Sequence, residues 1–170
     1  MRKGMEGLSA QVKTRVLVKR DSRPCMTRDQ RHHTNAYIFG AVCPPRDCGV
    51  ALVLPDSDTY AMNLYLVALG KQVAAGGHAK VIVYGAGWHI AAALRVSENI
   101  SLLFLSPYSP ELNAQENIWQ YLRQNFLAGR IFDTCNDIVD ACCNAWKALT
   151  GETGRIASIA TRDWLQWMGS

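Results

Sequence analysis

The pattern of apolar and polar positions along the chain predicts an α/β order of elements. Two segments rich in β-branched and aromatic residues, at 35–43 and 50–55, flank a short turn and favour an antiparallel hairpin. Residues 79–84 and 100–105 are short apolar runs of the kind found in buried strands. A weaker alternation over residues 12–19 predicts one more strand before the hairpin.

Apolar positions at helical spacing predict two long helices between and after these strands. One covers residues 60–75 after a cap at Ser57 or Asp58, and the other covers residues 134–149 and ends at Gly151. Shorter helical segments are predicted at three further places, over residues 88–95, 111–126 and 156–167. An antiparallel pair followed by strands that are joined through helices is typical of a mixed α/β sheet.

Composition is consistent with one globular domain. The chain has 170 residues, of which 49% are hydrophobic and 19% charged. It has no apolar run near the roughly 20 residues that cross a bilayer, and its N-terminus lacks a signal-peptide pattern, so we expect a cytoplasmic location and no membrane partner. Its six cysteines show no paired CxxC spacing, which favours reduced thiols over a zinc site or a disulfide framework.

The net charge of +4 is unevenly distributed. Residues 1–31 hold nine Lys or Arg against three acids, whereas the rest of the chain carries a small net negative charge. We therefore expect a basic N-terminal arm over residues 1–34, with at most one short strand, before a domain over residues 35–170. Such an arm suits contacts with DNA phosphates, although the same charge run is equally typical of a solvated chain end. The candidate DNA-binding residues are Lys13, Arg15, Lys19, Arg20 and Arg23.

Two other motifs are weak indicators of a site. His32 and His33 are adjacent, so their side chains point in different directions and are poorly placed to bind one metal ion. The sequence GAG at 85–87 follows a predicted strand but lacks the spacing of a dinucleotide fingerprint or a P-loop.

The stretch LSPYSPELNAQENIW, residues 105–119, carries the strongest candidate. Pro107 and Pro110 stiffen the connection between a strand end and a helix start, which places Glu116 in the first turns of that helix. A carboxylate there can hold a metal ion over the sheet. Considered alone, however, an acid near a helix N-terminus is more typical of a surface residue that the helix dipole favours.

PYSPELN followed by ENIW closely resembles the end of the catalytic domain of DDE transposases, in the bacterial insertion-sequence branch of the mariner superfamily. This chain has Ala114 and Gln115 where the usual motif has proline and an apolar residue. Five further segments extend the resemblance over nearly the whole chain: SRP at 22–24, YIFGAVCP at 37–44, LVLP at 52–55, GAGWH at 85–89 and ENISLL at 98–103. The resemblance implies an RNase H-like mixed sheet flanked by helices. It also implies DNA cleavage and strand transfer by two Mg²⁺ ions that three carboxylates hold.

The three implied acids can be located one at a time, and one is present. The third maps to Glu116. The second position, just before GAGWH, is Tyr84, whose phenol has an ordinary pKa of about 10 and is neutral at pH 7. The first acid belongs to a strand upstream of the matching segments. We therefore expect the first, central strand to be missing, with residues 12–19 filling the gap only in part.

These observations predict a truncated insertion-sequence transposase that is catalytically inactive and does not bind Mg²⁺ productively. The alternative is a non-enzymatic remnant that binds DNA weakly, or that associates with itself or with a full-length transposase. The helix-turn-helix region that reads terminal repeats in the family is not in this chain, which argues against specific recognition. The chain could also be the downstream product of a frameshifted gene, but Tyr84 argues against a working enzyme in that case too.

Overall fold

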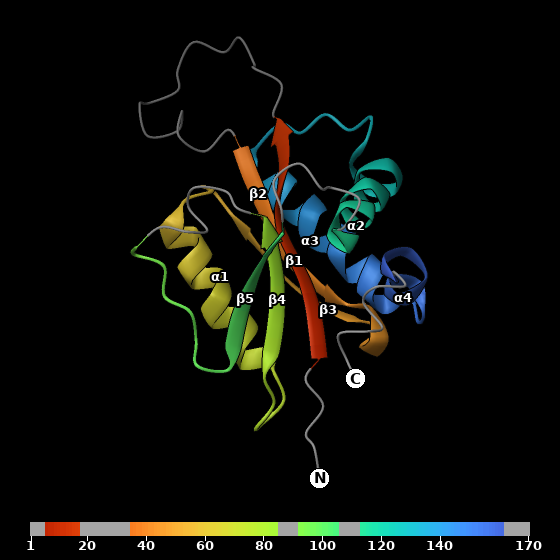
Figure 1. The fold of residues 1–170 in the computed structure, drawn as a ribbon. Helices are drawn as coiled ribbons and strands as arrows, with labels where there is room; N and C mark the ends of the chain where they lie inside the picture. The colour runs from red at the N-terminus through yellow and green to blue at the C-terminus, as the bar shows by residue number, and fades with distance from the viewer. Residues whose placement is uncertain (1–5, 18–34, 85–91, 106–112, 162–170) are drawn as a thin grey trace.

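A five-stranded mixed sheet forms the centre of the computed structural model (Figure 1). The structure describes residues 6–17, 35–84, 92–105 and 113–161, with the backbone alone at residues 6–17, 35 and 84. The strand order in the sheet is β3-β2-β1-β4-β5. The strands are β1 (Glu6–Leu17), β2 (Asn35–Cys43), β3 (Cys48–Leu54), β4 (Ala79–Tyr84) and β5 (Ile100–Leu105).

Strand β1 lies in the middle of the sheet. It pairs antiparallel with β2 and parallel with β4, so it joins the hairpin to the parallel strands. The prediction that the central strand is missing is therefore wrong. The physical reason is that a gap would leave two unpaired strand edges, and residues 6–17 provide backbone groups that pair with both. The sheet thus includes residues from both sides of the boundary that the sequence suggested at residue 34.

Helix α1 (Thr59–Gln72) covers one face of the sheet. Its start is set by Asp58, whose carboxylate accepts a 2.8 Å hydrogen bond from the backbone N–H of Ala61 and so satisfies one of the unpaired donors of the first turn. The predicted apolar stripe is confirmed, because its first four members are buried against β2, β4 and β5: Met62, Tyr65, Leu66 and Leu69.

The remaining helices pack on the opposite face, as Figure 1 shows. They are α2 (Ala114–Leu122), the π-helical turn η5 (Arg123–Leu127), α3 (Cys135–Gly151) and α4 (Arg155–Ala160). The predicted start of α3 is confirmed by a capping box, in which Thr134 and Asp137 each accept the other's backbone N–H. The core on this face joins Ile82 of the sheet to Ile118, Trp119, Ile138 and Cys142 of the helices.

Two local predictions were wrong. Strand β5 is less buried than its apolar sequence indicates, with Leu103 39% and Phe104 49% exposed, because it lies at the edge of the sheet and has a neighbour on one side alone. Residues 92–95 form a turn and irregular backbone where a helix was expected, and residues 85–91 lie outside the described residues. Within the described ranges, no helix is long and apolar enough to cross a membrane. The cytoplasmic location stays a prediction.

Candidate functional site

Glu116 lies in the first turn of α2, as its sequence motif predicted. Asn113 caps this helix, since its buried side-chain oxygen accepts a 3.1 Å hydrogen bond from the backbone N–H of Gln115. The backbone N–H of Glu116 donates to the carbonyl oxygen of Asn113 at 3.1 Å. The local sequence Asn-Ala-Gln-Glu therefore fixes where the helix begins and places Glu116 in its first turn.

The environment of Glu116 disfavours its charged form. Partial burial raises the pKa of this carboxyl above its ordinary value, and the guanidinium of Arg123, seven residues later, lowers the pKa by a smaller amount. A half-buried carboxylate whose charge is incompletely balanced is the kind of group that a cation stabilises.

Position 84 lies on the same face of the sheet as α2. Tyr84 is the last residue of β4, where it pairs with Leu105 of β5. Ile82, two residues earlier, packs in the same core cluster as Ile118 of α2. Because residues two apart on a strand share a face, position 84 faces the layer that contains Glu116. The position expected for the second acid is therefore on the correct side of the sheet, but it holds a tyrosine.

The central strand brings no carboxylate close to position 84. The one acid of β1 is Glu6, which pairs with Ala79 at the start of β4. Tyr84 is five residues further along β4, which at about 3.3 Å per residue is about 16 Å away. Among the residues that the structure describes, no group of three or more His, Cys, Asp or Glu could hold a metal ion. The residues that the structure describes therefore do not fit the paired Mg²⁺ site that the family implies.

The predicted DNA-binding residues fall in two groups. Lys13 and Arg15 belong to β1, at the place where its register with β2 shifts between Val12 and Arg15. These two residues are therefore in the sheet and not in a separate arm. The other three lie outside the described residues: Lys19, Arg20 and Arg23. Their DNA-binding role stays a prediction.

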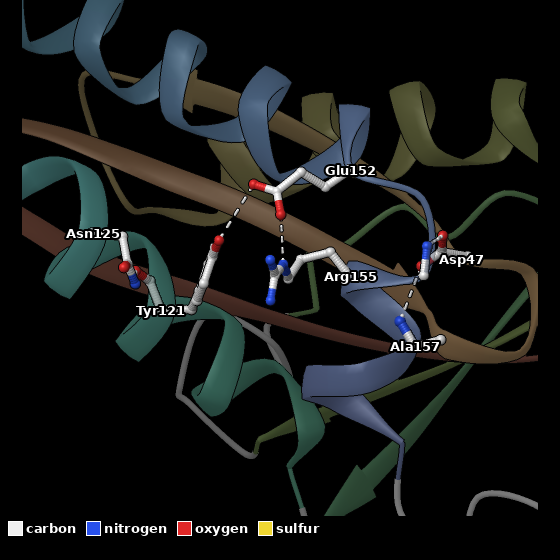
Figure 2. Close-up of polar contacts among 7 residues, drawn as sticks. Asp47, Tyr121, Asn125, Glu152, Arg155 and Ala157 are labelled. Atoms are coloured by element: carbon white, nitrogen blue, oxygen red, sulfur yellow. Dashed lines mark hydrogen bonds and ion pairs between the residues drawn. The ribbon is translucent and has the colours of Figure 1, made fainter.

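Helix α2 is held in place by polar contacts that the sequence reading missed (Figure 2). The hydroxyl of Tyr121 on α2 lies 3.5 Å from a carboxylate oxygen of Glu152, which follows α3. The other oxygen of Glu152 accepts a 2.6 Å hydrogen bond from Arg155 of α4, and that guanidinium lies 5.5 Å from the centre of the Tyr121 ring. The side-chain amide of Asn117 also donates to the carbonyl oxygen of Ile159 at 3.2 Å. These contacts fix the helix that carries Glu116 against α4.

The turn between β2 and β3 also anchors α4. Both carboxylate oxygens of Asp47 accept backbone N–H groups at the start of α4, from Gly154 and from Ala157 (Figure 2). These backbone donors hold the pKa of Asp47 below its ordinary value. The residue adopts a left-handed φ of 49°, which aspartate tolerates better than most residues. The sequence shows an acid in a Pro-Pro-Arg-Asp turn, but it does not show that the hydrogen-bond donors to this acid come from α4.

Comparison with known proteins supports this architecture. The chain is 50% identical over 129 residues to the uncharacterized protein y4pE/y4sA of Sinorhizobium fredii (strain NBRC 101917 / NGR234), an alignment that covers 76% of this chain and 96% of the relative. The fold is similar to that in the crystal structure of the Mos1 Strand Transfer Complex, with a TM-score of 0.58 at 14% identity over 92% of this chain. This likeness confirms the predicted RNase H-like arrangement. The chain spans about half, 55%, of the length of that Mos1 chain.

The sequence family described as DDE superfamily endonuclease matches residues 7–139, a range that runs from β1 into α3 and includes both Tyr84 and Glu116. This chain therefore belongs to the DDE superfamily endonuclease family.

Proposed function

We propose that this chain is an insertion-sequence transposase domain that has lost DNA cleavage and strand transfer. The observation that carries the proposal is the mismatch between an intact sheet and an incomplete set of acids. The central strand is present, yet its one acid pairs with the far end of β4, and position 84 is a tyrosine. A single carboxylate cannot neutralise two divalent cations at close range.

The chemistry that this chain can supply is correspondingly limited. When bound in the family's site, Mg²⁺ would activate the attacking oxygen and stabilise the leaving oxygen of the phosphodiester. Glu116 alone offers at most two ligand oxygens, and the neutral phenol at position 84 adds at most one weak donor. We therefore propose that Mg²⁺ is not bound productively and that no phosphodiester step takes place on this chain.

A nicking assay tests the loss of catalysis. Supercoiled plasmid carrying the terminal repeats of a related insertion sequence is incubated with the purified chain and Mg²⁺ or Mn²⁺. We expect no nicking above the level given by the matched variant Glu116→Gln, which keeps the size of the side chain and removes its charge. Robust nicking that Glu116→Gln abolishes would contradict the proposal.

The second candidate function is non-enzymatic binding of DNA or of a full-length transposase. It is motivated by the excess of Lys and Arg in residues 1–31, two of which, Lys13 and Arg15, belong to β1. We expect weak, non-specific binding that a mobility shift detects at low salt and that weakens steeply as salt rises.

Matched charge changes separate arm-directed binding from general attraction. The double variant Arg20→Ala/Arg23→Ala should weaken the mobility shift. It should also reduce the number of counterions released on binding, read from the slope of log affinity against log salt concentration, by about one to two. Arg130→Ala, a cation after η5 and far from the arm in the sequence, is the control and should change binding little. Equal losses in both variants, or no shift at low salt, would contradict a binding role for the arm. Light scattering with and without a full-length transposase tests the protein partner and self-association.

The proposed origin is a truncated or frameshifted insertion-sequence gene. The nucleotide sequence upstream of the Met1 codon distinguishes the two, because a frameshifted gene would continue upstream as an open reading frame in a different phase.

A further inference from the structure

We propose that Cys43 and Cys48 form a reversible disulfide, so that the closed end of the β2-β3 hairpin is a redox modification site. This site is separate from the candidate transposase site. Ala79, at the start of β4, lies at the cavity that contains both cysteines, whereas position 84 is at the other end of that strand.

The register of the hairpin places the two cysteines opposite each other. Cys43 is the last residue of β2, Cys48 is the first of β3, and the two are direct partners. Opposed residues of an antiparallel pair share a face, with Cα atoms about 4.5–5.5 Å apart, which lies within the span of about 4.4–6.8 Å that a disulfide bridges. The turn is closed by a 3.1 Å hydrogen bond from the N–H of Asp47 to the carbonyl oxygen of Pro44, so the pair is held in register.

Both thiols line one cavity of about 280 Å³ between the hairpin and the C-terminal end of α1. Leu69 and Val73 form part of its apolar wall. Cys43 is buried and Cys48 is exposed, so an oxidant from solvent reacts with Cys48 first. Cys43 is then the neighbouring thiol that can react with the oxidised Cys48. Arg46 and His78 line the same cavity.

The proposed oxidant is a peroxide. The Cys48 thiolate attacks one peroxide oxygen, the O–O bond breaks, and Cys48 becomes a sulfenic acid while the other oxygen leaves as hydroxide or alkoxide. The Cys43 sulfur then attacks the Cys48 sulfur, the S–S bond forms, and the sulfenic hydroxyl leaves with the Cys43 proton as water. The two thiols together lose two electrons, which reduce the peroxide. A dithiol reductant reverses the reaction.

The other described cysteines do not offer an equivalent pair. Cys142 and Cys143 are adjacent on α3, so their side chains point about 100° apart around the helix. Burial raises the pKa of Cys142 to about 12, which keeps it a thiol. Cys135 lies at the start of α3, seven residues before Cys142, which is two turns along the helix.

Peptide mapping tests the proposal directly, because trypsin cleaves after Arg46, between the two cysteines. The resulting peptides, residues 32–46 and 47–71, each contain one cysteine. The other four cysteines fall in two further peptides, Cys25 in one and Cys135, Cys142 and Cys143 in the other. The folded full-length chain is treated with hydrogen peroxide, its remaining thiols are blocked, and it is digested without reductant. We expect these two peptides to appear linked, with the mass of two hydrogens lost, and to separate after reduction.

Two other results would overturn the proposal. One is separate oxidation of Cys43 and Cys48 to sulfinic acids with no linked peptides, and the other is preferential linkage of either residue to Cys25, Cys135 or Cys143. In the variant Cys48→Ser the linked pair should vanish, while in the control Cys135→Ser it should form at the wild-type rate. Mapping of the wild-type chain decides the question even if Cys48→Ser fails to fold.

Discussion

The carboxylate of Asp47 accepts a 3.0 Å hydrogen bond from the backbone N–H of Ala157, a residue 110 positions later in the chain. The first N–H groups of α4 lack a local side-chain cap, because its N-cap residue is Gly154. Asp47 therefore serves as a cap from another part of the fold. Through α4 it also steadies Arg155 and Glu152, which contact the helix that carries Glu116.

Replacing Asp47 should destabilise the protein. In Asp47→Ala the N–H groups of Gly154 and Ala157 lose their acceptor, so we expect a lower melting temperature by calorimetry at pH 7. The control Asp140→Ala removes an exposed acid of α3 and should leave the melting temperature nearly unchanged.

The effect of Asp47 should also depend on pH. Its pKa is lower in the folded state than in the unfolded state, so its stabilising contribution is present above the unfolded value and is lost as the pH falls through the folded value. The difference in melting temperature between wild type and Asp47→Ala should be constant from pH 5 to pH 7, and it should shrink below about pH 4. A difference that persists unchanged in strong acid would contradict this account.

Adding a methyl group at Gly40 should weaken the core. A Cβ there would lie 2.7 Å from Cη2 of Trp119 and 3.2 Å from Cη2 of Trp146, and Trp119 is fully buried. We expect Gly40→Ala to lower the free energy of unfolding by about 1–3 kcal/mol in urea titrations. Gly151→Ala is the matched control. No described atom lies within 4 Å of the added methyl, and alanine is the better helix former, so this change should raise stability slightly.

Removing the buried amide of Gln115 should stabilise the protein. Its side chain is fully buried on α2, and neither its oxygen nor its nitrogen has a hydrogen-bond partner among the described residues. An unsatisfied buried amide costs about 1–3 kcal/mol, so Gln115→Leu should raise the free energy of unfolding by about 1–2 kcal/mol. Gln120→Leu, on the exposed side of the same helix, should change it by less than about 0.5 kcal/mol. Destabilisation by Gln115→Leu would show that the amide is satisfied in solution.

Neutralising Glu116 should not destabilise the fold at pH 7. Its folded pKa is raised, mainly by burial, so the charged form costs stability as the pH rises through that value. We expect Glu116→Gln to match or exceed the wild-type melting temperature at pH 7 and to lose this advantage at about pH 4. The control Glu98→Gln changes an exposed acid before β5 and should leave the melting temperature at pH 7 nearly unchanged.

Restoring a metal site should require two substitutions. Ser9 pairs with Ile82, so position 11 of β1 is level with position 84 when the register is extended by two residues. Adjacent strands lie about 4.8 Å apart, which brings two acids at these positions close together. We expect the double variant Gln11→Asp/Tyr84→Asp to bind Mn²⁺ in calorimetric titrations, and Tyr84→Asp alone to show no binding. Equal binding by both, or binding that survives Glu116→Gln, would contradict the assigned geometry.

Local sequence was sufficient for the elements whose causes lie within a few residues. Apolar runs predicted β4 and the β2-β3 hairpin, because burial and β-branching act residue by residue. The cap at Asp58 was one of the two candidates that the sequence offered, since a cap bonds to N–H groups two or three positions away. The motif around Glu116 predicted its place at a helix start for the same reason.

The tertiary structure decided what depends on distant partners. Strand β1 was underestimated because its sequence alternates weakly, whereas pairing with β2 on one side and β4 on the other supplies the hydrogen bonds that hold it. The same register places Glu6 beside Ala79 and so separates it from position 84. This separation cannot be predicted from the number of acids in the sequence. The sequence by itself determined which carboxylates exist. Only the fold, by bringing together backbone groups far apart in the chain, determined where they lie and that Asp47 caps a helix 110 residues away.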